Sequence, residues 1–433
     1  MRLNEFTKHP KIVIIGGGFG GIQLAKTLKH LDGEVLLIDR HNYHTFQPLL
    51  YQVATGSIQA ESISFPLRKI FHNQDNLTVI YANVKSIDSA NNTIITSDGN
   101  VCYDYLVLAT GSNTNFFGNQ QIEHYTMPMK NVTEALNLRS LMLQNLEAAF
   151  LEEDPDKKQA LLNFVIVGGG PTGVELSGSL AEFRNHVLAK DFPEHKKETM
   201  KVYLIEGKTE LLAAMSEEAS VHAKKNLTEL GVEISNDVHV KSYDGELLTI
   251  DDGRTIRTKN VIWAAGVKGE LPEGFSPGAV TKGNRVQVDT TNRVHGYENI
   301  FAIGDAAAMI TLDTPQGHPG VAPVAMQQGK HLGENLIRII KGEPTKPFVY
   351  NDKGSLATIG RNKAVADLGK IHLHGFIAWL IWIFVHLMSL VGFTNRLIVF
   401  LSWASSYLTY NGGNRLIIRR FNTKEMKLEV DSD

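Results

Sequence analysis

Short apolar runs rich in β-branched residues open two similar segments of the chain. The runs at 12–15 and 164–167 each lead into glycines and then into a helical pattern, KIVIIGGGFGGIQLAKTL and NFVIVGGGPTGVELSGSL. A second apolar run follows each helix and ends in an acid, EVLLID at 34–39 and KVYLIE at 201–206. Strand, turn, helix and strand at this spacing form a βαβ unit, which builds a parallel sheet with helices on its faces. The pattern therefore predicts an α/β fold with two such sheets.

Other segments of the chain fit this architecture. Strand ends that open into turns of small residues are predicted at 103–112, 259–267 and 299–308. An amphipathic helix is predicted for 133–153, with Leu136, Met142, Leu146 and Phe150 on successive turns. The EEDPDKK sequence at its end is interpreted as a solvated connection.

The C-terminal region has a different character, with long apolar segments and many aromatic residues. The stretch 376–393 is long enough to be read as a membrane span, but His386 would lie in its middle, and a short second segment ends near residue 410. Three interpretations stay open: an interfacial helical anchor, which we favour, a buried dimer interface, and a true span. The aromatic side chains suited to a headgroup interface are Trp379, Trp382, Trp403, Tyr407 and Tyr410. The arginines that would face anionic lipid are Arg396, Arg415, Arg419 and Arg420.

Composition and charge exclude several classes of protein. The 433 residues are 43% hydrophobic with a net charge of −3, so neither disorder nor a global attraction to nucleic acid is expected. A single cysteine, Cys102, excludes an internal disulfide and a metal site built from cysteine alone, and no metal site is expected. The N-terminus resembles neither a signal peptide nor an organelle-targeting sequence. Together with the favoured interfacial anchor, this N-terminus leads us to expect a peripheral protein on the cytoplasmic face of a prokaryotic cell membrane.

The first Gly-rich turn, Gly16–Gly21, has the Gly-x-Gly-x-x-Gly spacing of dinucleotide-binding proteins. Its glycines allow a tight turn, a close approach to a pyrophosphate and the packing of helix on strand, and Asp39 is placed to accept from ribose hydroxyls. The segment from Ile300 to Asp305 matches the element with which two-dinucleotide flavoproteins reach the ribityl and phosphate groups of FAD. A helix N-cap is the alternative role of Asp305. Thr110 and Gly111 form the companion turn, and the first sheet is predicted to bind FAD non-covalently.

The second Gly-rich turn, Gly168–Gly173, repeats this spacing. Glu206 ends the next strand, where an acid hydrogen-bonds a ribose 2′-hydroxyl and repels a 2′-phosphate, so NADH is predicted over NADPH. Both sheets are thus Rossmann-like dinucleotide-binding domains. The residues predicted to bind the two dinucleotides are Gly16, Gly18, Phe19, Gly20, Gly21, Asp39, Arg40, Gln47, Thr110, Gly111, Gly304, Asp305, Ala325, Gln327, Gly168, Gly170, Gly173, Glu206, Ala265 and Gly266.

The sequence also limits the possible electron acceptors of a reduced flavin. Relatives that reduce disulfides carry a cysteine pair shortly after the first acidic strand, but HNYHTFQPLLYQVATG at 41–56 contains none. Thiol relay and the covalent sulfur chemistry of sulfide oxidation are therefore excluded. A soluble carrier, oxygen or a quinone remain, and a membrane anchor favours a lipid-soluble acceptor.

Taken together, both Gly-rich turns, HNYHTFQPLLYQVATG, NVIWAAGV, NIFAIGDAA, VAMQQG and GRNKAVADL resemble the type II NADH:quinone oxidoreductases over essentially the whole chain. The resemblance implies a non-pumping respiratory dehydrogenase that is usually a homodimer and monotopic on the membrane, with quinone approaching the flavin from the lipid side. It also implies that 1–118 and 285–350 form the FAD-binding domain, 119–284 the NADH-binding domain and 351–433 a C-terminal helical membrane-anchoring region.

The resemblance further implies three catalytic residues. Glu175 falls in the PTGVE motif, where it would help to order NADH or relay protons; an early-helix acid that favours the helix dipole is the alternative. Gln327 in AMQQG would donate to a quinone carbonyl, and Lys363 in GRNKAVADL would lie near the quinone end of the flavin, or be a solvated lysine. Many relatives have Ala-Gln where this chain reads Ala322-Pro323, which removes a side-chain donor. Gln47 and Tyr51 would line the flavin or simply pack.

These expectations combine into a mechanism of two steps. NADH stacks against the flavin and transfers a hydride to its N5, and the reduced flavin then passes two electrons to a quinone. Two other functions share the same turns: a reductase of a soluble ferredoxin-like carrier, and a slow-turnover signalling flavoprotein that binds both dinucleotides.

Overall fold

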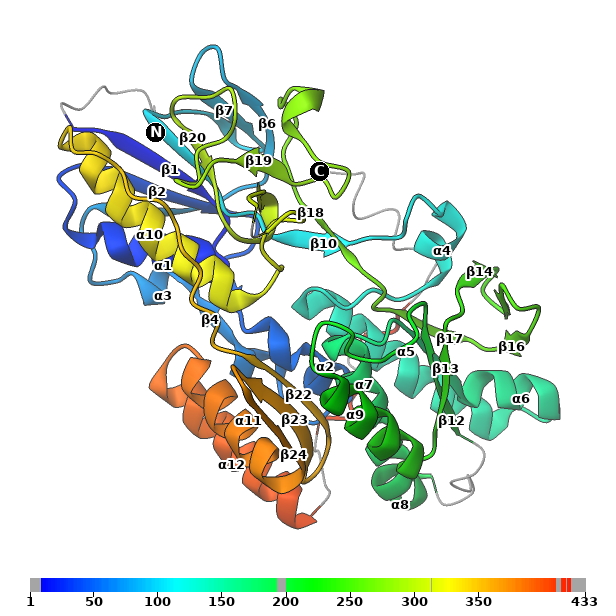
Figure 1. Cartoon of the computed structure of the whole chain (residues 1–433). Coiled ribbons are helices and arrows are strands. Elements are labelled where there is room, and N and C mark those ends of the chain that lie inside the picture. Colours follow the sequence, from blue (N-terminus) through cyan, green and yellow to red (C-terminus); the bar gives the residue numbers. More distant parts are fainter. Residues whose placement is uncertain (1–8, 193–199, 313, 410–413, 418, 422–433) are drawn as a thin grey trace. The chain divides into compact units, whose positions relative to one another are not determined.

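The chain packs as two compact units in a computed structural model, which describes residues 9–192, 200–312, 314–409, 414–417 and 419–421 (Figure 1). The first unit comprises Met1–His44, Phe65–Asn113 and Val267–Asp352, and the second comprises Thr45–Ser64, Thr114–Gly266 and Lys353–Asp433. The functional domain boundaries predicted above stay a prediction, because one packing unit can hold parts of more than one domain.

The first unit is built on a five-stranded parallel sheet of order β20-β9-β1-β2-β5. Its central strand, β1, has the apolar run that the sequence shows, because both of its faces are buried. Ile12 and Ile14 face one hydrophobic core, while Val13 and Ile15 face another. The strands are β1 (Lys11–Ile15), β2 (Glu34–Asp39), β5 (Leu77–Tyr81), β9 (Tyr105–Leu108) and β20 (Ile300–Ala302).

Helices α1 (Phe19–Thr27) and α10 (Ala322–Ile340) pack against each other and against the first of these cores. Glycines allow this close packing, since a Cβ at Gly329 would lie 2.4 Å from the carbonyl oxygen of Gly20. The other core is covered by the antiparallel sheet β6 (Val84–Asp88), β7 (Thr93–Thr96) and β8 (Gly99–Cys102), together with β19 (Val286–Val288) and β21 (Ala307–Met309).

The second unit repeats the parallel architecture with four strands in the order β13-β12-β11-β17. These strands are β11 (Asn163–Val167), β12 (Lys201–Glu206), β13 (Val232–Asn236) and β17 (Asn260–Trp263). Helices α7 (Pro171–Glu182) and α9 (Glu217–Glu229) complete the βαβ units, and β14 (Val240–Tyr243), β15 (Leu247–Ile250) and β16 (Thr255–Arg257) form a separate antiparallel sheet. The predicted Rossmann-like doubling is confirmed.

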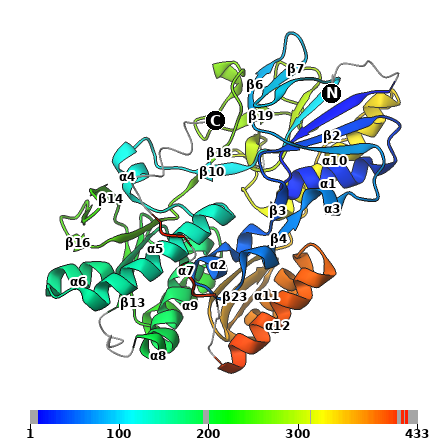
Figure 2. The same ribbon diagram turned by 180° about the vertical axis from the view of Figure 1, so that it is seen from behind.

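A long helix, α5, and a short one, α6, precede this sheet in the sequence (Figure 2). α5 (Val132–Leu151) confirms the helix predicted for 133–153, but Phe150 lies 46% exposed at its end rather than on the buried face. The solvated connection predicted from EEDPDKK is confirmed only for 152–154, because α6 (Pro155–Leu162) begins within this run. Asp154 caps α6 through its side chain and Pro155 occupies the first helical position, which is the usual composition of a helix start.

The C-terminal segment adds a third layer to the second unit. The antiparallel sheet β22 (Ser355–Gly360), β23 (Lys363–Leu368) and β24 (Ile371–His374) contacts α7 and α9, and α11 (Gly375–Ser389) covers its opposite side in Figure 1. Gly178 of α7 permits this packing, because a Cβ there would lie 1.8 Å from the carbonyl oxygen of Ile359. α12 (Phe393–Thr409) follows α11 after a short break.

Candidate active site

The first Gly-rich turn connects β1 to α1 and has the geometry of a phosphate-binding loop. Gly16 has φ +107°, and a Cβ at Gly21 would lie 1.9 Å from the carbonyl oxygen of Gly16, so both positions require glycine for the fold itself. Gly18 differs, since a Cβ there would meet nothing within 4 Å. Gly18 is also the N-cap of α1 and supplies no side-chain cap. The open space and the uncapped N–H groups fit the pyrophosphate of a dinucleotide.

The acid at the end of β2 fixes this turn. The Asp39 carboxylate accepts hydrogen bonds from Gly17 N at 2.5 Å and His41 N at 2.6 Å. Arg40 forms two hydrogen bonds with the Glu270 carboxylate, at 2.5 and 2.9 Å. The carboxylate predicted to meet a ribose therefore also holds the backbone of the loop that would surround the phosphates.

The other residues predicted around the first turn lie in the same packing unit. The Thr110 hydroxyl donates to the Glu270 carbonyl, and Asp305 accepts from Ser112 Oγ at 2.6 Å. Gly304 N donates to Gln328 Oε1 at 2.7 Å, so the neighbour of the predicted Gln327 holds this loop, and Gln328 is buried. Four more predicted residues lie in this unit. Gly111 has a positive φ, and a Cβ at Gly20 would lie 3.2 Å from the Ala325 carbonyl oxygen. The ring of Phe19 lies edge-on to that of His44, with the ring centroids 5.0 Å apart.

The second Gly-rich turn reproduces the first position by position. Gly168 has φ +112°, a Cβ at Gly173 would lie 1.8 Å from the Gly168 carbonyl oxygen, and Gly170 has open space. Glu206 accepts from Gly169 N and from Lys208 N, as Asp39 does from its own turn. Nearby, Gly266 has φ +134° and directly follows Ala265, and its carbonyl accepts from Asn115 N at 3.1 Å. The structure therefore contains two equivalent dinucleotide cradles.

Glu175 lies in the buried interior of the second unit. It begins the second turn of α7, and its Oε1 accepts from Thr358 N and from the indole N–H of Trp382, each at 3.3 Å. Burial raises the pKa of Glu175 to about 8, against the opposing effect of these two donors, so the carboxyl is protonated at neutral pH. Burial, with the charge of Glu175 as a second cause, raises the pKa of Tyr51 well above its ordinary value.

A further hydrogen-bonded chain surrounds Tyr51. Trp403 Nε1 donates to Gln52 Oε1 at 2.7 Å, and Gln52 Nε2 donates to the Tyr51 hydroxyl at 2.9 Å. His386 stacks on Trp382 with ring centroids 4.1 Å apart, and burial lowers its pKa to about 4, so its imidazole is neutral. The sequence did not predict the hydrogen bonds of Thr358 to Glu175 or of Trp403 to Gln52, because residues so far apart in the chain give no local signal.

The other predicted catalytic residues have different partners. Gln327 Nε2 donates to the Asn351 carbonyl at 2.9 Å, and Gln327 Oε1 accepts from Asn351 N at 3.0 Å. Lys363 Nζ lies 2.6 Å from Glu229 Oε2, and neither side chain is buried. Gln47 is exposed and donates to the Lys130 carbonyl at 3.3 Å. Glu175 and Lys363 belong to the second unit, whereas Gln327 belongs to the first.

The C-terminal helices carry a row of exposed apolar side chains. Spaced by four residues along α11 and then along α12, these are Phe376, Leu380, Phe384, Met388, Phe393, Leu397 and Leu401. Placing Trp382 among headgroups is wrong, because it is 2% exposed and its N–H is used by Glu175. Trp379, Trp403 and Tyr407 remain at least partly exposed, and Tyr410 lies outside the described residues.

None of the helices in the described part of the chain has the length and apolarity needed to cross a membrane. The stretch 376–393, considered above as a span, is not one helix, since α11 ends at Ser389 and α12 begins at Phe393.

Comparisons with known proteins agree with this geometry. The family model for pyridine nucleotide-disulphide oxidoreductases matches 10–329, and the model for the NDH2 C-terminal domain matches 353–410. A type II NADH:quinone oxidoreductase of Mycobacterium tuberculosis is 36% identical over 95% of this chain and 90% of its own length. The chain belongs to the type II NADH:quinone oxidoreductases.

Solved structures show the same fold. NDH2 of Plasmodium falciparum in complex with NADH superposes with a TM-score of 0.86 at 22% identity, covering 95% of this chain and all of that one. A sulfide:quinone oxidoreductase of Aquifex aeolicus superposes with a TM-score of 0.68 at 21% identity, covering 98% and 95%. A Staphylococcus aureus type II NADH:quinone oxidoreductase is 28% identical over 82% of this chain and 89% of its own. In this member of the family the single cysteine, Cys102, lies in β8, away from the 41–56 segment in the sequence.

Substituting two glycines of the second turn should separate binding from folding. In Gly170→Ala the new methyl group enters open space, so we expect the flavin absorbance and the thermal unfolding midpoint to be unchanged. The KM for NADH should rise by about tenfold, equivalent to about 1.4 kcal/mol of lost binding. Gly173→Ala should instead lower the unfolding midpoint, since it displaces the Gly168 carbonyl. Equal losses of stability in both variants would contradict this assignment.

The raised pKa of Glu175 predicts a pH-dependent stability. A carboxyl with a folded-state pKa near 8 contributes stability that is fully present below its unfolded pKa, about 4.5, and is lost as the pH rises through 8. Relative to Glu175→Gln, the unfolding midpoint of the unmodified protein should therefore fall steadily between about pH 5 and pH 8. Thermal scans of both proteins test this, and parallel midpoints across that range would show that Glu175 is ionised.

Proposed function

We propose that this chain oxidises NADH and reduces a membrane quinone through bound FAD, without pumping protons. The overall reaction is NADH + H⁺ + quinone → NAD⁺ + quinol, so one proton per turnover comes from solvent or from the protein. The observation that supports it most strongly is the presence of two matched cradles in one member of this family, each with an open central glycine at Gly18 and Gly170.

Each of the two dinucleotide-binding turns would hold one of the two dinucleotides. The first Gly-rich turn, Asp39, Thr110 and Asp305 would hold FAD, which when bound accepts a hydride and returns two electrons to the quinone. The second Gly-rich turn would hold the NADH pyrophosphate on the N-terminus of α7. Because Glu206 is acidic and its turn mirrors that of Asp39, we assign it to the ribose hydroxyls of NADH and to the rejection of a 2′-phosphate.

Glu175 is proposed to hold a proton for quinone reduction. Both of its hydrogen bonds are accepted by Oε1, which leaves Oε2 to carry the proton at neutral pH. Its donors, Thr358 of β22 and Trp382 of α11, belong to the C-terminal segment, so this segment fixes the orientation of the carboxyl. An early-helix acid that serves only the dipole would gain nothing from burial, since the helix dipole favours the ionised form.

Gln327 and Lys363 are proposed at the quinone end of the reaction. The Gln327 amide would exchange its bonds to Asn351 for a quinone carbonyl. Lys363 would exchange its pair with Glu229, which costs little because exposed ion pairs contribute only about 0–1 kcal/mol. Pro323 provides no donor where many relatives have glutamine, so Gln327 would be the main side-chain donor of this motif.

The exposed apolar row of α11 and α12 is proposed as the membrane anchor. A continuous row of large apolar side chains on adjacent helices is uncommon on a free surface and suits insertion into the outer part of one leaflet. Arg396, Arg419 and Arg420 would supply positive charge for anionic lipid, whereas the Arg415 guanidinium is paired with Asp191 at 2.5 Å. A homodimer, attached as a monotopic protein to the cytoplasmic face of a prokaryotic membrane, completes the proposal.

Steady-state turnover tests the proposed acceptor. Under anaerobic conditions the purified protein should oxidise NADH continuously when a short-chain quinone is present, with one quinol formed for each NADH consumed. Turnover that requires a ferredoxin-like protein instead would contradict the quinone assignment. Reduction that stops after one equivalent per flavin with every acceptor would favour the signalling function.

The choice of NADH can be tested at Glu206. Glu206→Gln keeps the size and the hydrogen-bond acceptor of the side chain but removes its charge, so kcat/KM for NADPH should rise by about tenfold or more relative to NADH, or about 1.4 kcal/mol. Steady-state kinetics with both nucleotides measures this ratio. An unchanged ratio would remove Glu206 from the specificity assignment.

Charged substitutions in the exposed row test the anchor. The double variant Phe384→Glu/Leu401→Glu should lose most of its binding to vesicles that contain anionic lipid, because both side chains would enter the apolar region. Phe117→Glu provides the control, since Phe117 is 66% exposed and lies outside α11 and α12. Cosedimentation that is unchanged in the double variant, or lost equally in the control, would place the anchor elsewhere.

A further inference from the structure

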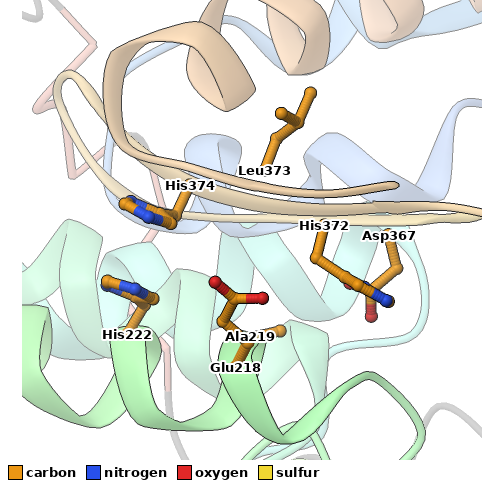
Figure 3. A pocket seen from close by; sticks show the side chains of 7 residues that line it. All are labelled: Glu218, Ala219, His222, Asp367, His372, Leu373 and His374. Carbon is orange, nitrogen blue, oxygen red and sulfur yellow. The ribbon is translucent and has the colours of Figure 1, made fainter. Parts of the chain in front are cut away.

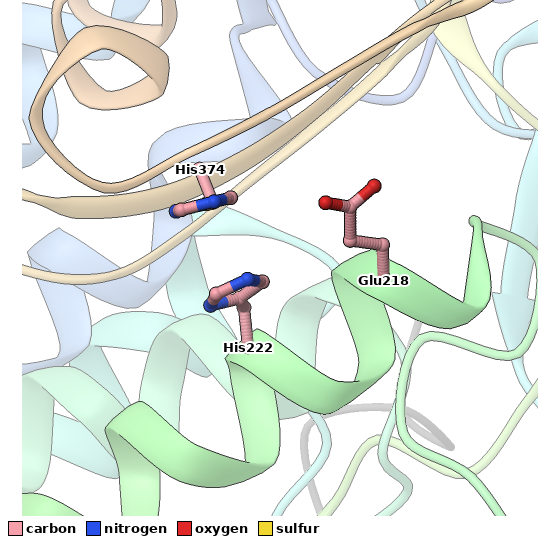
Figure 4. A group of neighbouring side chains, drawn as sticks. All are labelled: Glu218, His222 and His374. Carbon is pink, nitrogen blue, oxygen red and sulfur yellow. The ribbon is translucent and has the colours of Figure 1, made fainter.

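Two histidines and a glutamate from distant parts of the sequence meet on the surface of the second unit. Glu218 and His222 lie one turn apart on α9, so their side chains share a face of the helix, and His374 ends β24 (Figure 4). One ligand atom from each of the three residues lies within 4.8 Å of the others. The His222 and His374 rings stack with centroids 3.7 Å apart and an angle of 17° between their planes.

The scaffold beneath these side chains is held in place by a neighbouring acid. Asp367 of β23 accepts from Ser216 N at 2.6 Å and from Ser216 Oγ at 2.8 Å. Ser216 is in turn the N-cap of α9, so the first turn of this helix is fixed to the sheet that carries His374. His372 completes the surroundings through a contact of 2.6 Å with Asp367 (Figure 3). The Asp367 carboxylate is therefore occupied, and it supports the cluster instead of joining it.

We propose that Glu218, His222 and His374 form a binding site for a divalent transition-metal ion, with Zn²⁺ as the best match. Two imidazoles and one carboxylate, with water in the fourth position, are a common zinc ligand set, whereas Ca²⁺ and Mg²⁺ prefer oxygen ligands alone. Ligand atoms around tetrahedral zinc are about 3.4 Å apart, so the three side chains must close by about an ångström. The two rings must also tilt out of their stack, because an imidazole binds a metal in its own plane. Glu218 and His374 are exposed, which leaves room for both movements.

The position of His374 determines which part of the chain a bound metal would stabilise. His374 is the N-cap residue of α11, which carries both the exposed apolar row and Trp382, the donor to Glu175. A metal bound here would tie the start of α11 to α9 of the nucleotide-binding sheet. Binding should therefore stabilise the C-terminal segment against unfolding. This proposal departs from the expectation of no metal site, and no local pattern in the sequence indicates the cluster because His374 lies about 150 residues after His222.

Zinc titration of the full-length holoprotein without an affinity tag tests the proposal. Calorimetry should show one Zn²⁺ per chain and a rise in the thermal unfolding midpoint, with no comparable effect of Mg²⁺ or Ca²⁺. Bound Co²⁺ should give the visible absorption of a tetrahedral site. Glu218→Gln and His374→Ala should each weaken Zn²⁺ binding by at least about tenfold, since even the loss of a supporting contact commonly costs 10–100-fold.

Two variants distinguish zinc binding at this cluster from zinc binding at exposed histidines elsewhere on the surface. His374→Phe keeps an aromatic ring on His222 but removes a ligand, so it should fold normally and lose zinc binding. His239→Ala is the matched control, because His239 is an exposed histidine paired with a single carboxylate, Asp251, at 3.2 Å. Zinc binding that survives in His374→Phe, that is lost in His239→Ala, or that is absent from the unmodified protein would overturn the proposal.

Discussion

The geometry of the two Gly-rich turns determines how strand, helix and phosphate site are joined in each unit. Each turn follows an inner strand of a parallel sheet and leads into a helix. The carbonyl oxygen of the first glycine of the turn lies so close to Gly21, or to Gly173, that neither can carry a side chain. The acid at the end of the next strand, Asp39 or Glu206, then accepts a hydrogen bond from the turn itself. The backbone of the turn, the neighbouring strand and the helix terminus are thus held by the protein's own contacts, and such a rigid turn lowers the entropy cost of binding a phosphate.

The C-terminal segment supplies the hydrogen-bond donors of a buried carboxyl with a raised pKa in the nucleotide-binding fold. Glu175 belongs to the α7 helix of the second cradle, yet its two hydrogen-bond donors come from β22 and α11. The close packing of Gly178 against Ile359 brings this sheet onto the helix. The same α11 exposes its other side as an apolar row. One helix thus serves both the buried carboxyl and, in our proposal, the lipid surface.

Much of the fold could be predicted from the sequence, because its signals are local. Apolar runs followed by spaced glycines indicated both βαβ units, and the acids that end the next strands fell at the predicted positions. The failures have physical reasons. The start of α6 at Asp154 and Pro155 was obscured by its high charge, and Trp382 was assigned to headgroups by residue type, although its burial depends on a partner about 200 residues away. The partners of Gln327 and Lys363, and the cluster around His374, likewise depend on tertiary contacts that no local pattern encodes.

The most direct test of the central claim follows the flavin itself through the two half-reactions. The purified protein is made anaerobic, and its visible absorbance is recorded as NADH and then a short-chain quinone are added. One equivalent of NADH should bleach the flavin band, and one equivalent of quinone should restore it. Bleaching without recovery would keep the two dinucleotide cradles but contradict the quinone as acceptor, and an absorbance that NADH does not change would contradict the transfer from the second cradle to the first.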